Sequence, residues 1–246
     1  DMTNRGASEG KPTRRRTTPL TAVEADLAVA ITPLRVRWAA NAALRPVSAA
    51  AMRGIRAKAA RLGLSAEAIS EAAGAALADV ARAVAAARDP ERLLPIFVLA
   101  GSDRDAVYGL EAALALADGK RRIVVALCGS KARPEHAAAA GAWDRLESAN
   151  RVERYRIPNM RESAHFRAGI EEVAVLVESL GGAPSNAAPQ VPLLAGIDLL
   201  RRARSVGVPC IAANGPIGLD PDSGARRRGA PGADISVLFH RPLITH

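Results

Sequence analysis

The residues that could do chemistry gather in loops that follow apolar runs. In "IAANGPIGLDPDSG" (211–224) an apolar run leads directly into a loop that begins with Asn214 and continues with Asp220 and Asp222. A carboxylate at such a place could transfer protons, whereas the Asn214 amide cannot act as a general base near neutral pH. Asp220 and Asp222 are therefore the fallback bases of the loop, although Asp in a turn more often caps and braces the backbone.

The elements that must position this loop alternate between strands and helices. Continuous apolar runs predict buried strands within 93–101 and 121–129, and further strands are predicted within 150–157, 172–180, 208–215 and 233–241. Helical spacing predicts helices at 48–62, at 65–87, after 105, at about 133–149 and at 193–206. This alternation indicates βαβ units and a mainly parallel sheet, with its binding crevice beyond the carboxyl ends of the strands. Three loops should line that crevice: 101–109, 178–186 and 214–224.

The chain divides into three parts by composition. Residues 1–20 are polar and basic and predict a flexible arm, 21–45 predict a helical extension interrupted by Pro33, and 46–246 form the α/β domain. No membrane span or secretory signal is predicted. Cys128 and Cys210 lie in apolar runs, which favours buried thiols in a reducing compartment, cytoplasm or organellar matrix, over a disulfide or a metal site.

The charge of the chain points to anionic partners. The formal net charge is +9, but only 3% of the residues are aromatic, so few side chains could stack on single-stranded bases. Each basic cluster could simply be solvated, and a surface shared by several clusters would indicate a binding face. The clustered arginines are Arg14, Arg15, Arg16, Arg201, Arg202, Arg204, Arg226, Arg227 and Arg228.

Six short motifs, in order, resemble those of the NAD(P)H-hydrate epimerase family, also called the YjeF N-terminal domain family. They are "VSAAAMR" (47–53), "EAAG" (71–74), "GSDRDAVYGL" (101–110), "ESLGGAP" (178–184), "ANGPIGLDPDSG" (213–224) and "ADISVLFHRP" (233–242). The resemblance covers most of the chain and implies a three-layer α/β/α sandwich, Rossmann-like or flavodoxin-like. It also implies an isomerase that interconverts the R and S epimers of hydrated NADH or NADPH.

The polar positions of those motifs depart from the family pattern. The family's catalytic aspartate falls on Asn214, and the serine that follows it in the motif falls on Ile217. The family's monovalent-cation site falls on Ala72, Asp105 and Glu178. The nucleotide-binding loop keeps two glycines but gains carboxylates that repel phosphate. Its positions, with one from the later loop, are Gly101, Ser102, Asp103, Arg104, Asp105, Tyr108, Gly109 and Gly218.

These departures favour a catalytically inactive homologue that uses the fold for binding, with no cofactor. A basic chain suits RNA, a ribonucleoprotein or an acidic protein partner, and the resemblance allows a homodimer. One family member, the C-terminal domain of the mRNA-decapping enhancer scaffold, serves RNA binding and dimerisation. The alternatives are an active epimerase with a rearranged site, which would need an NAD(P)-type nucleotide and potassium, and a protein-binding module that docks through the helix at 21–44.

The four histidines are scattered along the sequence, which favours surface or structural roles. They are His136, His165, His240 and His246.

Overall fold

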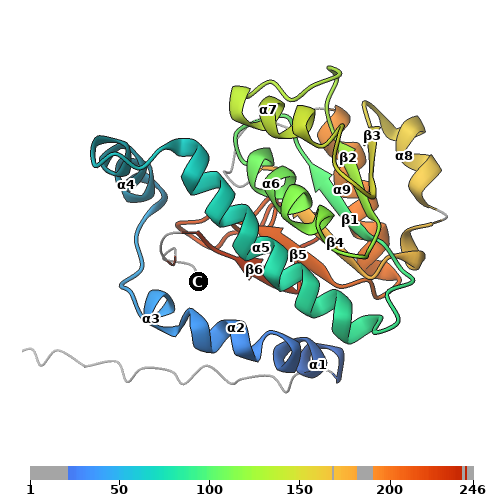
Figure 1. Ribbon diagram of the computed structural model, residues 1–246, viewed down its shortest axis with the longest axis horizontal. Helices are drawn as coiled ribbons and strands as arrows, with labels where there is room; N and C mark the ends of the chain where they lie inside the picture. The colour runs from blue at the N-terminus through green and yellow to red at the C-terminus, as the bar shows by residue number, and fades with distance from the viewer. Residues whose placement is uncertain (1–21, 168, 182–190, 240–241, 243–246) are drawn as a thin grey trace, which may run out of the picture.

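The structure, a computed structural model, describes residues 22–167, 169–181, 191–239 and 242 of the chain. Its centre is a six-stranded, all-parallel sheet with the strand order β3-β2-β1-β4-β5-β6 (Figure 1). The strands are β1 (Ile96–Ala100), β2 (Ile123–Leu127), β3 (Val152–Arg156), β4 (Val175–Ser179), β5 (Cys210–Ala213) and β6 (Ile235–Val237). Every strand predicted from the sequence is present, and the order is that of a Rossmann-like fold.

Helices cover both faces of the sheet and make three layers (Figure 1). One face packs against α5 (Ala66–Arg88), α6 (Ala106–Ala117) and α7 (Ala137–Arg145). The other face packs against α8 (Met160–Arg167), the short 3-10 helix η1 (Ile170–Glu172) and α9 (Val191–Ser205). Two separate apolar clusters result, because neighbouring residues of a buried strand point to opposite faces.

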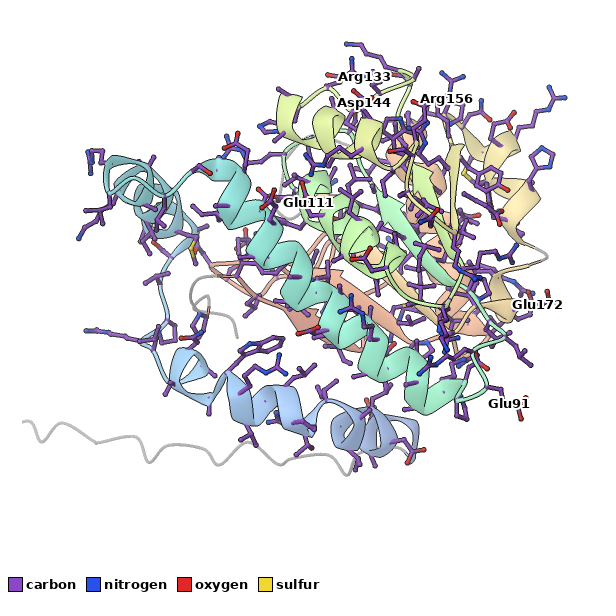
Figure 2. All side chains as sticks on the ribbon, viewed as in Figure 1. Glu91, Glu111, Arg133, Asp144, Arg156 and Glu172 are labelled. Carbon is purple, nitrogen blue, oxygen red and sulfur yellow. The ribbon has the colours of Figure 1, made fainter. Side chains whose placement is uncertain are left out.

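The close packing of α5 on α6 depends on small residues. Gly74 of α5 lies against Glu111 of α6, and a Cβ on Gly74 would stand 2.4 Å from the Glu111 Cβ. Glu111, which is labelled in Figure 2, is itself almost buried and pairs with Arg145 of α7. The glycine of the "EAAG" motif is therefore a packing residue in this chain.

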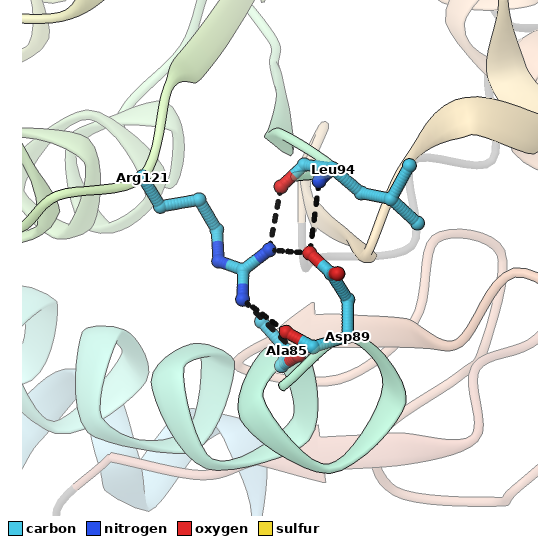
Figure 3. Close-up of polar contacts among 4 residues, drawn as sticks. All are labelled: Ala85, Asp89, Leu94 and Arg121. Atoms are coloured by element: carbon cyan, nitrogen blue, oxygen red, sulfur yellow. Dashed lines mark hydrogen bonds and ion pairs between the residues drawn. The ribbon is translucent and has the colours of Figure 1, made fainter. Parts of the chain in front are cut away.

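A buried ion pair lies at the amino-terminal edge of the sheet, where β1 and β2 begin (Figure 3). The Arg121 guanidinium, just before β2, pairs with the Asp89 carboxylate at the end of α5 and donates to the carbonyls of Leu94 (2.6 Å) and Asp89 (2.8 Å). The Leu94 N–H donates to Asp89 Oδ2 at 2.8 Å. Burial acts to raise the pKa of Asp89, but these hydrogen bonds outweigh it and hold that pKa below its ordinary value.

Within the described part of the chain, four further helices precede α5: α1 (Ala22–Ala30), α2 (Thr32–Arg37), α3 (Ala39–Ala42) and α4 (Ala49–Arg61). Leu27 and Leu34 join the apolar cluster beneath α5, and Arg37 pairs with Asp79 of α5 at 3.0 Å. The predicted break occurs where Pro33 stands in the first turn of α2. The inner face of this segment is thus covered by the chain's own α5, while Val29 and Val36 remain exposed.

Two helix predictions need correction. The helix expected at about 133–149 begins only at Ala137, because the N–H groups of Glu135 and His136 donate to the Ser102 carbonyl instead. Helix α8 was not predicted, although Asn159 marks its start: the Asn159 Oδ1 accepts from the N–H groups of Arg161 (3.0 Å) and Glu162 (3.1 Å).

Two other expectations are confirmed. Both thiols are free and buried, and burial raises the pKa of each to about 12. Among the helices that the structure describes, none combines the length and the apolar character that crossing a bilayer requires.

Candidate functional site

The crevice expected from the sequence lies where the strand order reverses. From β1 the sheet runs to β2 and β3 on one side and to β4, β5 and β6 on the other, so the switch point lies between the carboxyl ends of β1 and β4. There the Gly101 N–H donates to the Ser179 carbonyl at 2.9 Å. A Cβ on Gly101 would stand 2.4 Å from the Leu180 carbonyl oxygen, so only glycine allows this approach.

The loop after β1 is bound to its neighbours rather than open. Both the carbonyl and the Oγ of Ser102 accept from the Glu135 N–H, at 2.8 and 3.1 Å. Asp103 Oδ1 accepts from the Asp105 N–H at 3.2 Å, while the Arg104 side chain is exposed. Desolvation and the nearby Asp105 carboxylate raise the pKa of Asp103. A phosphate at the start of α6 would therefore meet two carboxylates, and the Asp105 N–H there already donates to Asp103.

Tyr108 and Gly109, in the first turn of α6, belong to the core. Tyr108 is 3% exposed and its ring packs on Phe239 with the centroids 4.6 Å apart. The Gly109 N–H donates to Ser179 Oγ at 3.1 Å, and Ser179 Oγ in turn donates to the Asp105 carbonyl at 2.6 Å. Ser179 could not be selected from the sequence alone. Its hydroxyl joins the end of β4 to the start of α6, and this role becomes visible only in the contact with Gly109.

Glu178, at the end of β4, is the one carboxyl group buried in the crevice among the described residues. It is 1% exposed, and its Oε1 accepts from the Ile217 N–H at 2.9 Å. Its Oε2 has no hydrogen-bond partner among the described residues. Burial raises the pKa of Glu178 to about 8, despite the opposing Ile217 hydrogen bond. At neutral pH the group is mainly protonated and holds the 214–218 turn.

The turn after β5 keeps its shape through the backbone. Asn214 has φ +59 and its N–H donates to the Val237 carbonyl at 2.8 Å. Gly218 has φ +78, and its carbonyl accepts from the Arg227 N–H at 2.8 Å. Asn accepts a left-handed conformation more readily than most side chains, so Asn214 suits the turn sterically.

Asp220 and Asp222 both accept hydrogen bonds from backbone N–H groups. Asp220 Oδ1 accepts from Asp222 (3.0 Å) and Ser223 (2.7 Å), and these hydrogen bonds lower the pKa of Asp220. Asp222 Oδ1 accepts from the Ala49 N–H at the start of α4, at 2.7 Å. Their observed partners are those of turn and helix caps.

The three positions that match the family's cation site do not come together as a ligand set. Ala72 is exposed on α5, Asp105 precedes α6, and Glu178 points to the opposite face of the sheet, where Leu176 joins the α9 cluster. Within the described residues no three His, Cys, Asp or Glu side chains are grouped as a metal site would require.

Two of the three arginine clusters lie together. Arg201 of α9 donates through Nε and Nη2 to the Gly229 carbonyl, at 2.9 and 2.5 Å, which places α9 beside the 226–229 loop. Arg202 pairs with Glu171, and Arg204 pairs with Asp234, each at 3.0 Å. An open groove of about 600 Å³ runs along α9 and is lined by Arg167, Asp198, Arg201, Arg202 and Ser205. Arg14, Arg15 and Arg16 lie outside the described residues.

Two of the four histidines lie within the described residues. His136 precedes α7, with its Nδ1 buried and without a partner among the described residues. His165 is exposed on α8, and His240 and His246 are outside the described residues. Arg133, in the loop before α7, pairs with Asp144 of α7, and both are labelled in Figure 2.

The parallel sheet, its strand order and the loop-lined switch point define a Rossmann-like α/β protein. Residues 66–245 match the family described as YjeF-related protein N-terminus, and the chain belongs to this family, that of the NAD(P)H-hydrate epimerases. The crystal structure of the yeast protein YNL200c is similar to this chain, with a TM-score of 0.60, 18% identity and 76% of each chain covered. At that identity the likeness concerns the fold. No curated protein matches the chain.

Proposed function

We propose that the chain is a non-catalytic member of the epimerase family that acts as a binding or structural subunit for RNA or a ribonucleoprotein. The observation that carries this proposal is Asn214, an amide at the position of the family's proton-transferring carboxylate. Loss of a general base removes roughly 10²- to 10⁴-fold of rate. Among the described residues, the carboxyl groups of this turn and of β4 already have other partners: Glu178 is buried against Ile217, and Asp220 and Asp222 accept from backbone N–H groups.

The nucleotide side of the crevice supports the same proposal. Asp103 and Asp105 stand at the start of α6, where a pyrophosphate would need hydrogen-bond donors. Ser102 is already bound to the loop before α7. The start of α6 therefore presents carboxylates rather than hydrogen-bond donors to the phosphates of an NAD(P)-type nucleotide. Two of the arginine clusters lie on α9 and the 226–229 loop instead.

A calorimetric titration of the chain with NADP⁺, AMP and RNA at two salt concentrations tests the proposal. We expect no heat of binding for either nucleotide, and RNA binding that weakens steeply with salt. Nucleotide binding that Asp103→Asn strengthens, since that change removes repulsion, would instead favour a retained site. Absence of RNA binding at low salt would contradict the proposed partner.

One observation favours a second candidate, an enzyme with a rearranged site. Asp103 has a raised pKa and lies at the switch point, beside Gly181, and a perturbed carboxyl group in a crevice is a candidate acid or base. If Asp103 acts in this way, epimerisation will be measurable in the native chain and will be lost in Asp103→Asn, with folding unchanged.

A further inference from the structure

Helix α9 and the loop at 229–232 lie against each other. Arg201 of α9 donates through Nε and Nη2 to the Gly229 carbonyl, at 2.9 and 2.5 Å. Three residues further along α9, Arg204 pairs with Asp234, which follows the loop, at 3.0 Å. These contacts bind the loop to the helix at both of its ends.

Two guanidinium groups lie directly against the glycines of this loop. A Cβ on Gly229 would stand 2.8 Å from Arg201 Nη2, and a Cβ on Gly232 would stand 3.1 Å from Arg226 Nη1. Both glycines have a positive φ, +78 and +70, so the backbone conformation also disfavours a side chain there. Because the two glycines are three residues apart, they lie at most about 11 Å from each other. Arg201 and Arg226 therefore meet at one short loop, although 25 residues separate them in sequence.

The positive charge of these two arginines is not balanced within the described fold. Both residues are exposed, and among the described residues neither forms an ion pair with a carboxylate. The N–H groups of Gly229 and Gly232 likewise donate to no acceptor in the part of the chain that the structure describes. Arg201, Arg226 and the 229–232 loop, here called the arginine site, therefore combine positive charge with several hydrogen-bond donors.

The groove along α9 continues from the arginine site. Four of its lining residues recur at helical spacing and so share one face of α9: Asp198, Arg201, Arg202 and Ser205. The fifth is Arg167 of α8, which pairs with Asp198. Each of these residues ends in a charged or polar group, and none of the five is aliphatic or aromatic. Because Arg201 belongs to both, the groove and the arginine site form one surface.

We propose that the arginine site binds the phosphate backbone of RNA, with Arg201 and Arg226 each contacting a phosphate group and the groove along α9 holding the adjoining stretch of the strand. This inference rests on the proposed function and assigns the surface that carries it. Guanidinium groups match the oxygens of a phosphate, and arginine and serine side chains and backbone N–H groups commonly make such contacts. An acidic protein segment fits less well, because protein interfaces depend on buried apolar and aromatic anchors, which the groove lining does not offer.

Fluorescence anisotropy with a labelled single-stranded RNA of about 16 nucleotides tests this site in the full chain. The site variant is Arg201→Gln with Arg226→Gln. The matched control is Arg35→Gln with Arg92→Gln, which removes the same charge from exposed positions on α2 and in the loop before β1. Each lost phosphate contact lowers the salt slope by about 0.7, so the site variant should bind about 25-fold more weakly at about 0.1 M salt. The control should keep the native salt slope, because it removes no phosphate contact.

A lysine variant separates the charge of the site from the shape of the loop. Glutamine at position 201 removes the charge and also the paired hydrogen bonds to the Gly229 carbonyl. Arg201→Lys with Arg226→Lys keeps both positive charges but lacks the planar fork that makes those paired bonds. If the charges bind phosphate, the lysine variant should keep the native salt slope and recover most of the affinity that the glutamine variant loses.

The outcomes separate the site from the function. Failure of the native chain to bind any RNA at low salt would overturn the proposed function and this inference with it. RNA binding that the site variant and the control weaken equally, or that the lysine variant loses as fully as the glutamine variant, would overturn the inference alone. Tighter binding of poly-glutamate or of phosphatidylserine vesicles than of RNA would also overturn it, by assigning the arginine site to another class of partner.

Discussion

Replacement of Glu178 by glutamine should change how the stability of the protein depends on pH. Glu178 is 1% exposed and accepts one hydrogen bond, from Ile217, and its pKa is raised from 4.5 to about 8. Between these two values the unfolded chain releases the proton that the folded protein keeps. The native protein therefore loses stability as pH rises from about 4.5 to about 8, and the loss is complete above that range. Glutamine has nearly the same shape and does not ionise.

The size of the effect follows from the width of that interval. About 3.5 pH units at about 1.4 kcal/mol each correspond to a free energy of roughly 5 kcal/mol. The free energy of unfolding of Glu178→Gln minus that of the native protein should therefore rise by about 1.4 kcal/mol per pH unit and level off near pH 8. The comparison removes the contribution of every other titrating group, because these are common to both proteins.

Urea unfolding of both proteins at intervals from pH 4 to pH 9 provides the measurement. Glu91, exposed in the loop before β1 and labelled in Figure 2, offers the matched control substitution, Glu91→Gln, at a glutamate outside the crevice. A constant difference for Glu178→Gln across the range would refute the reasoning. It would mean that Glu178 is ionised in the folded protein, with a partner for its second oxygen.

Three other predictions concern stability. Gly74→Ala should lower the free energy of unfolding by about 1–3 kcal/mol because its Cβ has no room against α6, whereas Gly141→Ala, with nothing within 4 Å, should raise it by about 0.5–1 kcal/mol; chemical denaturation of both checks the pair. Arg121→Met should lower the melting temperature sharply by leaving the Asp89 carboxylate buried and unpaired, and the loss should shrink at pH values where that carboxylate is protonated. Asn214→Val should cost about 1–2 kcal/mol in denaturation experiments because of its φ of +59, whereas Asn214→Asp should unfold close to the native value.

The fold could be predicted from the sequence because its signals are local. The buried strands β1 and β2 are continuous apolar runs, and the helices α4 and α5 carry both helical spacing and a serine cap, such as Ser65, whose Oγ accepts from the Ala68 N–H at 3.0 Å. Helix α8 carried such a signal in Asn159 but is short and polar, with almost no apolar face to reveal it. The alternation of strands and helices then placed the crevice at the carboxyl edge, where the switch point lies.

The details of the site could not be predicted because they depend on residues distant in sequence. Ser179 becomes important only through the start of α6, 70 residues earlier, and Asp222 through the start of α4, 173 residues earlier. Glu178 could be matched to a family position, but its burial and its contact with Ile217 follow from the packing of α9 over the sheet.

Whether the chain is catalytic is tested most directly by the rate at which the purified chain interconverts the R and S epimers of hydrated NADPH. We expect no acceleration over the buffer rate for the native chain, and none for Asn214→Asp either, because the Asp103 and Asp105 carboxylates still repel the phosphates. Acceleration by the native chain that disappears in Asn214→Ala, or in Asp103→Asn, would contradict the account and establish an active enzyme.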